Sequence, residues 1–200
     1  MDLARLRERL RDPAPSLAEA VALPIASDDA AYLAPAPLIP AAVLVGIVQG
    51  LAPGILLTKR TSHLARHAGQ VAFPGGRIDP ADASPEAAAL REAQEEVGLD
   101  SARAELIGRL PDYVTGTGFR ITPCLALLPP DLALTPAPGE VESVFHLPLA
   151  VLLDPAAPQR ERVEFRGRMR EYWVWPHPDH YIWGATAAIL VHLAHRLRAT

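Results

Sequence analysis

The chain has 200 residues, of which 50% are hydrophobic and 21% charged, which excludes a disordered chain and suffices for one domain with a hydrophobic core. Its net charge of −4 argues against general binding to nucleic acid or to anionic membranes. A single cysteine, Cys124, excludes an internal disulfide and a cysteine-based zinc site. Its apolar neighbours indicate a buried core residue.

The N-terminal third is expected to contain one helix and two strands. Leucines at spacing i, i+3, i+7 predict a helix over residues 3–11, followed by a proline- and alanine-rich stretch. The run "AAVLVGIVQGLAPGILL" holds glycine, proline and glutamine in its middle, so it predicts two buried strands, 41–48 and 54–59, rather than a membrane span. The charged N-terminus lacks the apolar centre of a signal peptide, and we expect a cytoplasmic protein.

Residues 84 to 98 carry a strong helix signal. Ser84 is a suitable N-cap, Pro85 suits the first helical position, and Gly98 suits the C-terminal stop. An apolar stripe at i, i+3, i+7 is formed by Leu90, Ala93 and Val97, and the glutamates of "REAQEEV" are expected off that stripe. The preceding segment, 62–76, is expected to be a loop or a short helix that ends in "FPGG".

The second half of the chain predicts strands, a hairpin and a final helix. The expected strands are 104–115, 120–129 and 140–149. A hairpin is expected over 163–175 with its turn near Gly167, and a helix over 182–197. This mixture predicts a single α/β or α+β domain over 36–200, preceded by a helical extension over 1–35.

The helix over 84–98 would gather negative charge. Glu92, Glu95 and Glu96 share a helix face, where they repel one another. Such a face is either a solvated surface or a cation site. Carboxylate oxygens are preferred ligands of Mg²⁺ and Mn²⁺, ions that also bind substrate phosphates. The nearby "FPGGR" offers glycines for close backbone approach and Arg77 for positive charge, so the combination favours phosphate chemistry.

The order Gly-Gly, acidic loop and "REAQEEVGL" resembles the Nudix box, G-x5-E-x7-R-E-U-x-E-E-x-G-U with U aliphatic. The second half matches throughout, with Ala93 in the aliphatic position. The first half departs, because Asp82 stands in place of glutamate and eight residues, not seven, separate it from Arg91. The resemblance implies a Nudix-type α/β/α sandwich, with a mixed central sheet and flanking helices.

The segment before the box, "LLTKRTSHLARHAGQVAFPGG", is similar to the signature of the coenzyme A pyrophosphatase branch of this family, which typically carries the same lengthened, Asp-containing box. It departs at Ala65, where the branch often has arginine, although Arg66 follows. The resemblance covers about residues 40 to 195. It implies Mg²⁺- or Mn²⁺-dependent hydrolysis of the diphosphate of coenzyme A or acyl-CoA to 4'-phosphopantetheine, or its acyl form, and adenosine 3',5'-bisphosphate.

Two alternatives stay open at this level. One is a Nudix hydrolase for another nucleoside diphosphate derivative, such as NADH, a dinucleoside polyphosphate or an oxidised nucleotide. The other is a Nudix-like binding module without catalysis, although such modules commonly lose box glutamates. The expected partner is a small molecule, with no nucleic acid and no membrane, and a homodimer is left open.

The resemblance also implies roles for individual residues. The expected metal ligands are Glu92, Glu95 and Glu96, with Arg91 orienting a glutamate and Glu140, ahead of Glu142, as a distal base or ligand. The expected substrate contacts are Arg60, Arg66, Gly75, Gly76 and Arg77. The aromatic residues Tyr172, Trp173 and Trp175 suit either an adenine or packing of the hairpin on the core.

Overall fold

A computed structural model describes residues 7–8, 10, 37–63, 67–165 and 167–198. Most of the expected N-terminal extension therefore lies outside the described residues, as do Ala65 and Arg66. No helix among the described residues is long and apolar enough to cross a membrane.

The centre of the molecule is a mixed sheet of eight strands. Two long strands, β1 (Ile39–Val48) and β7 (Phe119–Leu128), run parallel side by side in its middle. The other strands are β2 (Gly54–Arg60), β3 (Val71–Ala72), β4 (Gly75–Arg77), β5 (Glu105–Arg109), β6 (Tyr113–Val114) and β8 (Val141–Pro148). The main path is β3-β2-β1-β7-β5, with β4 beside β1, β6 beside β7 and β8 beside β2.

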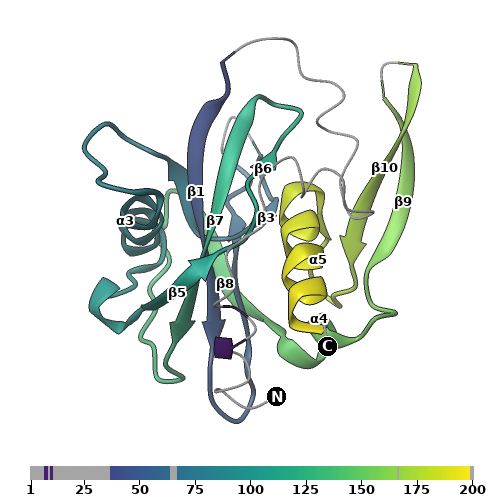
Figure 1. Ribbon diagram of the computed structural model, residues 1–200. Coiled ribbons are helices and arrows are strands. Elements are labelled where there is room, and N and C mark those ends of the chain that lie inside the picture. The colour runs from purple at the N-terminus through teal and green to yellow at the C-terminus, as the bar shows by residue number, and fades with distance from the viewer. Residues whose placement is uncertain (1–6, 9, 11–36, 64–66, 166, 199–200) are drawn as a thin grey trace.

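Helices cover both faces of this sheet (Figure 1). Helix α3 (Pro85–Val97) covers one face, while α5 (Gly184–Arg198) and the short α4 (Leu149–Leu153) lie on the other. Side chains of a strand alternate between faces, so Leu44 packs into the core under α3, whereas Val45 packs into the core that includes α5. The architecture is the predicted α/β/α sandwich with a mixed central sheet.

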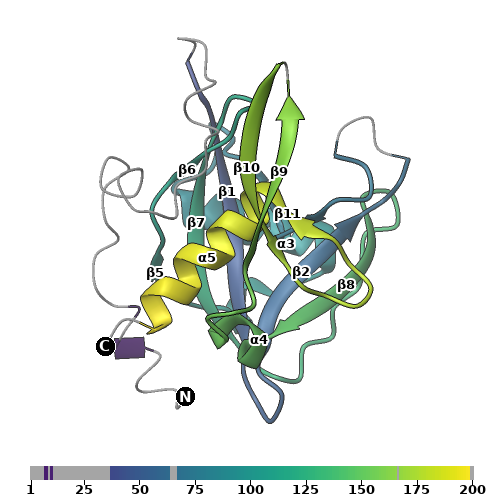
Figure 2. The ribbon, with the colours of Figure 1, turned by 90° about the vertical axis from the view of Figure 1, so that its right-hand side faces the viewer.

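A second, three-stranded sheet lies beside α5, in the order β11-β10-β9. It consists of β9 (Gln159–Phe165), β10 (Arg168–Trp175) and β11 (Ile182–Trp183), and Figures 1 and 2 show the β9–β10 hairpin extending past the end of α5. The predicted hairpin turn near Gly167, whose φ is 73°, is confirmed. The final helix begins at Gly184, because the two residues before it pair with β10 as β11.

Two predicted segments are corrected by the structure. The segment 62–76 is not simply a loop or short helix, since it contains β3 and β4. The expected strand 104–115 is divided into β5 and β6, and the break holds Pro111, which has no backbone N–H to donate. The sequence also missed α4 and a 3-10 turn at Ser101–Arg103.

Candidate active site

Helix α3 has the predicted caps but a different buried face. The Ser84 hydroxyl accepts a hydrogen bond from the Ala87 N–H, and Gly98 ends the helix with a φ of 67°. The buried side chains include Ala93, Val97 and also Glu96, which is only 4% exposed. The expectation that all three glutamates lie off the apolar stripe is therefore wrong for Glu96, which follows Ala93 by three positions and shares its face.

Glu96 is the most buried of four acidic side chains that we call the carboxylate group, namely Glu92, Glu95, Glu96 and Glu140. Its Oε2 accepts a hydrogen bond from the Gly75 N–H at 3.1 Å, and its Oε1 lies 3.6 Å from Nη1 of Arg60. Burial raises the pKa of Glu96 to about 7, and the charges of Glu92 and Glu140 add to the rise, against the opposing effects of Gly75 and Arg60. Burial is therefore the main reason why the ionised form of Glu96 is disfavoured.

Gly76 allows Glu92 to approach strand β4. A Cβ atom at Gly76 would lie 2.5 Å from Cδ of Glu92, closer than any real contact. At Gly75, a Cβ would lie 2.4 Å from the Ala42 carbonyl oxygen, and its φ of 155° also favours glycine. The backbone at both glycines does lie close to other groups, as expected, but these groups are the Glu92 side chain and the Ala42 carbonyl oxygen. A contact of either glycine with phosphate stays a prediction.

Glu92 is a second carboxylate whose ionised form is disfavoured. Its pKa is raised by burial, while Arg91 lowers it and the charges of Glu95 and Glu140 raise it further. Glu140 therefore lies near enough to act on both Glu92 and Glu96, although its side chain is exposed. The second candidate, Glu142, is instead paired with Lys59 at 2.7 Å.

Arg91 donates hydrogen bonds to two of the glutamates. Its Nη1 donates to Glu92 at 2.9 Å and to Glu95 at 3.2 Å. Its Nη2 donates to the carbonyl oxygen of Arg77 at 3.2 Å, which ties α3 to β4.

Asp82 anchors Arg91, a function that sequence analysis did not assign to it. The Nε and Nη2 groups of Arg91 donate to the two carboxylate oxygens of Asp82 at 3.1 and 3.0 Å. The Asp79 N–H also donates to Asp82, and the pKa of Asp82 is lowered chiefly by the Arg91 hydrogen bond. The signal in the sequence is an acidic residue at the box position that glutamate usually occupies.

The expected basic residues are not all gathered at Glu96. Arg60 faces it, as described, while the exposed Arg77 lies over the Phe119 ring at 5.8 Å from the centroid. Arg66 lies outside the described residues.

The carboxylates fit a hard cation by their chemistry. Desolvation and mutual repulsion raise the pKa values of Glu92 and Glu96, and a bound cation would offset both effects. Within the described ranges, no three acidic, histidine or cysteine side chains converge closely enough to hold a metal by themselves. Mg²⁺ commonly completes its octahedral shell with water and substrate phosphate, so an incomplete protein cage is compatible with it.

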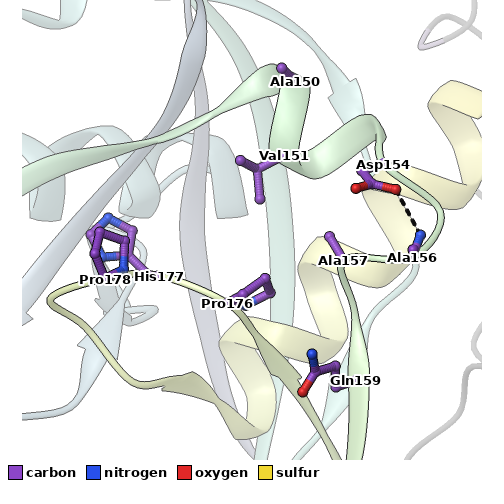
Figure 3. A pocket seen from close by; sticks show the side chains of 9 residues that line it. All are labelled: Ala150, Val151, Asp154, Ala156, Ala157, Gln159, Pro176, His177 and Pro178. Carbon is purple, nitrogen blue, oxygen red and sulfur yellow. Dashed lines mark hydrogen bonds between the residues drawn. The ribbon is translucent and has the colours of Figure 1, made fainter.

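A separate hollow of about 720 Å³ lies between α4 and the base of the hairpin (Figure 3). Alanine and proline side chains supply much of its lining, together with Gln159 and His177. Its one carboxylate, Asp154, accepts a hydrogen bond from the Ala156 N–H. No residue of the carboxylate group lines it, so it is not the predicted diphosphate site.

Two of the three aromatic residues noted in the sequence belong to the core. Trp175 is 1% exposed, and its Nε1–H donates to the Ala187 carbonyl oxygen at 3.0 Å. Trp173 packs against the same core, with the Arg160 guanidinium 4.3 Å from its ring centroid. Packing therefore accounts for Trp173 and Trp175, whereas the Tyr172 hydroxyl donates to Glu161 at 2.9 Å.

Comparison with known proteins identifies the family. Residues 38–174 match the model described as "NUDIX domain". The chain is 44% identical over 160 residues to "Uncharacterized Nudix hydrolase NudL" of Shigella flexneri, covering 80% of this chain and 83% of the relative. It is 45% identical over 154 residues to the protein of that name from Escherichia coli (strain K12), covering 77% and 80%.

Among solved structures, a MutT/nudix family protein from Enterococcus faecalis is 16% identical, covers 97% of this chain and 73% of its own, and has a TM-score of 0.48. The NUDIX match includes the whole central sheet and α3, with its three glutamates. The chain therefore belongs to the Nudix hydrolase family and is a diphosphate-hydrolysing enzyme.

Proposed function

We propose that this enzyme hydrolyses the diphosphate of coenzyme A or acyl-CoA to 4'-phosphopantetheine, or its acyl form, and adenosine 3',5'-bisphosphate. One observation carries the proposal. The segment 56–76, which resembles the coenzyme A signature, meets the box helix at Glu96, through the Gly75 N–H and Arg60. The residues that would select the substrate are thus joined to the carboxylate that would serve its hydrolysis.

Nudix hydrolases generally use divalent metals, and Glu92, Glu95 and Glu96 are the proposed ligands of Mg²⁺ or Mn²⁺. When bound, such an ion neutralises phosphate oxygens and lowers the pKa of an attacking water. The chain itself supplies the orientation, because Arg91 fixes Glu92 and Glu95 while Gly75 fixes Glu96. Such anchoring reduces the movement needed when the ligands come together.

Glu140 is the proposed base or additional ligand. Its charge acts on both Glu92 and Glu96, while its own side chain is exposed to solvent, from which an attacking water would come. Its backbone position is defined, since the Glu140 carbonyl oxygen accepts a hydrogen bond from the Thr61 N–H at 3.0 Å.

The proposed phosphate contacts are Arg60, Arg66 and Arg77, with backbone groups of Gly75 and Gly76. Arg60 has the strongest support, because its guanidinium lies 3.6 Å from Glu96, beyond an ordinary hydrogen bond. It can therefore turn toward a phosphate without breaking a short contact, and arginine offers paired donors for that purpose.

The direct test incubates the enzyme with CoA, acetyl-CoA, NADH, ADP-ribose or dNTPs in the presence of Mg²⁺ or Mn²⁺. The products are identified by mass spectrometry. We expect 4'-phosphopantetheine from CoA and the highest kcat/KM for CoA or acetyl-CoA. Glu96→Gln should lower kcat by several orders of magnitude while the fold is retained, because it removes a ligand charge. The control is Asp131→Asn, an equivalent change at an exposed ion pair with Arg103, which should leave kcat unchanged.

The possible failures separate the alternatives. Cleavage of NADH or ADP-ribose without cleavage of CoA would reject the substrate and keep the reaction class. Near-normal turnover by Glu96→Gln would reject the assigned metal site.

A further inference from the structure

The turn that carries Glu140 is tied to the end of helix α3. The Ala137 N–H donates to the Glu96 carbonyl oxygen at 2.8 Å. The last carbonyl groups of a helix have no partner within the helix, so the turn supplies one. The Ala137 carbonyl oxygen in its own turn accepts from the N–H groups of Glu140 and Val141, at 3.0 and 2.9 Å. One side of the turn is thus fixed to the residue that bears the Glu96 carboxylate.

Thr61 holds the opposite side of this turn. Its N–H donates to the Glu140 carbonyl oxygen at 3.0 Å, and its hydroxyl donates to the Gly139 carbonyl oxygen at 3.3 Å. Thr61 is only 9% exposed, so water has little access to replace its hydroxyl. Gly139 has no side chain, and no atom of the described residues lies within 4 Å of the position that its Cβ would take. Hydrogen bonds from Thr61 and within the turn, rather than side-chain packing, therefore hold Gly139 and Glu140.

A bulge between β2 and β8 separates the surroundings of Glu140 from those of Glu142. The register of the two strands shifts between Lys59 and Arg60, which leaves Glu142 without a residue opposite it. Lys59 and Arg60 are successive strand residues and point to opposite faces. Glu142 pairs with Lys59 at 2.7 Å, whereas Arg60 lies 3.6 Å from Glu96. Glu142 is thus engaged in an ion pair, and Glu140 is the acid that the turn presents next to Arg60.

We propose that Thr61 is a positioning residue for Glu140, which it holds on the side of Glu92 and Glu96. This inference deepens the proposed function and rests on it for the role of Glu140. The charge of Glu140 acts on both of the other carboxylates. Because Thr61 directly follows Arg60, one short segment holds the proposed phosphate contact and places the proposed base. A displacement of about 1 Å in an active site can cost roughly 100-fold in rate, so a modest loosening of the turn should be measurable.

The test removes the Thr61 hydroxyl by Thr61→Val, which keeps the shape of the side chain, and restores a hydroxyl by Thr61→Ser. We expect kcat to fall roughly 3- to 10-fold in Thr61→Val, the factor of one ordinary hydrogen bond, with KM changed less than about twofold. Thr61→Ser should keep most of kcat. The matched control is Thr186→Val, because Thr186 is 8% exposed and its hydroxyl donates to the Val71 carbonyl oxygen at 2.9 Å. It should leave kcat unchanged.

Combination with Glu140→Gln shows whether Thr61 acts through Glu140. If it does, Thr61→Val should lower kcat in the unmodified chain but cause no further fall in Glu140→Gln, whereas independent effects would multiply. Hydrogen exchange adds a readout without metal or substrate. The N–H groups of Glu140 and Val141, which close the turn, should exchange faster in Thr61→Val and not in Thr186→Val. Thr61→Ala takes the place of Thr61→Val if the valine variant does not fold.

An equal fall of kcat in both backgrounds, a rise in KM alone, or unchanged exchange at Glu140 and Val141 would overturn the inference. Full turnover by Glu140→Gln would also overturn it, while CoA cleavage by the unmodified chain would leave the proposed substrate standing. If the chain cleaves another compound of the panel and not CoA, the same variants are measured on that compound. Coupling between Thr61 and Glu140 would then support the inference although the proposed substrate fails.

Discussion

Replacing Gly76 with alanine should damage the active site while leaving the fold intact. The new Cβ would lie 2.5 Å from Cδ and 2.6 Å from both oxygens of Glu92. Carbon atoms pack at about 3.5–4.0 Å, so the carboxylate must move by roughly 1 Å. A displacement of about that size in an active site can cost roughly 100-fold in rate. We therefore expect kcat to fall about 100-fold.

The expected effect of Gly76→Ala on stability is small. Glu92 is displaced at the far end of a flexible side chain, and Gly76 has no positive φ that would strain alanine. A compatible Gly→Ala change typically stabilises by about 0.4–1 kcal/mol through the unfolded state, which offsets part of the cost. The melting temperature should therefore stay within a few degrees of the unmodified value.

Two matched glycine-to-alanine variants serve as comparisons for Gly76→Ala. Gly75→Ala places Cβ 2.4 Å from the Ala42 backbone oxygen at a φ of 155°, so it should lower Tm by several degrees or more. Gly139→Ala meets nothing within 4 Å and should change neither property. The assay combines steady-state hydrolysis of CoA with thermal unfolding followed by circular dichroism. Normal turnover in Gly76→Ala, or a Tm loss equal to that of Gly75→Ala, would refute the reasoning.

Three further outcomes follow from the electrostatics. Asp82→Asn should lower kcat about 10- to 100-fold, because it releases Arg91. A carboxyl whose pKa is lowered in the folded state stabilises the fold at pH values above its ordinary pKa of 3.8, and this stabilisation is lost as pH falls through the folded pKa, so Asp82→Asn should reduce the loss of stability in acid. A Tm–pH curve identical to that of the unmodified chain contradicts this. Burial lowers the pKa of His192 from 6.5 to about 4, so on acidification the unfolded chain takes up a proton before the folded chain does. The free energy of unfolding should therefore fall by at most roughly 3 kcal/mol as pH drops from 6.5 to about 4. His192→Gln should remove this pH dependence, as measured by urea titrations at pH 4 to 7. Mg²⁺ at 100 times its Kd should stabilise the folded chain by about 2.7 kcal/mol, and EDTA should reverse the effect. The stabilisation should be smaller in Glu96→Gln. Equal Tm shifts in Glu96→Gln and in the unmodified chain would count against Glu96 as a ligand.

Local chemistry in the sequence was sufficient to predict many of the elements. The bounds of α3 follow from Ser84, Pro85 and Gly98, whose effects act within one helical turn. The strands β1 and β7 follow from unbroken apolar runs, which suit strands buried on both faces. The contact of Arg91 with Glu95 also follows from local sequence, because Glu95 lies one turn further along the same helix.

Contacts between distant segments decided the rest. The burial of Glu96 depends on β4 packing against α3, and β4 is too short to show any periodicity in sequence. The bidentate hold of Asp82 on Arg91 depends on the folded path of the acidic loop. Trp183 lies beside Tyr172 because β11 pairs with β10. The sequence alone determined which groups are present and which local elements carry them. Only the tertiary structure decided their burial and their partners, because pKa and orientation depend on neighbours that are far away along the chain.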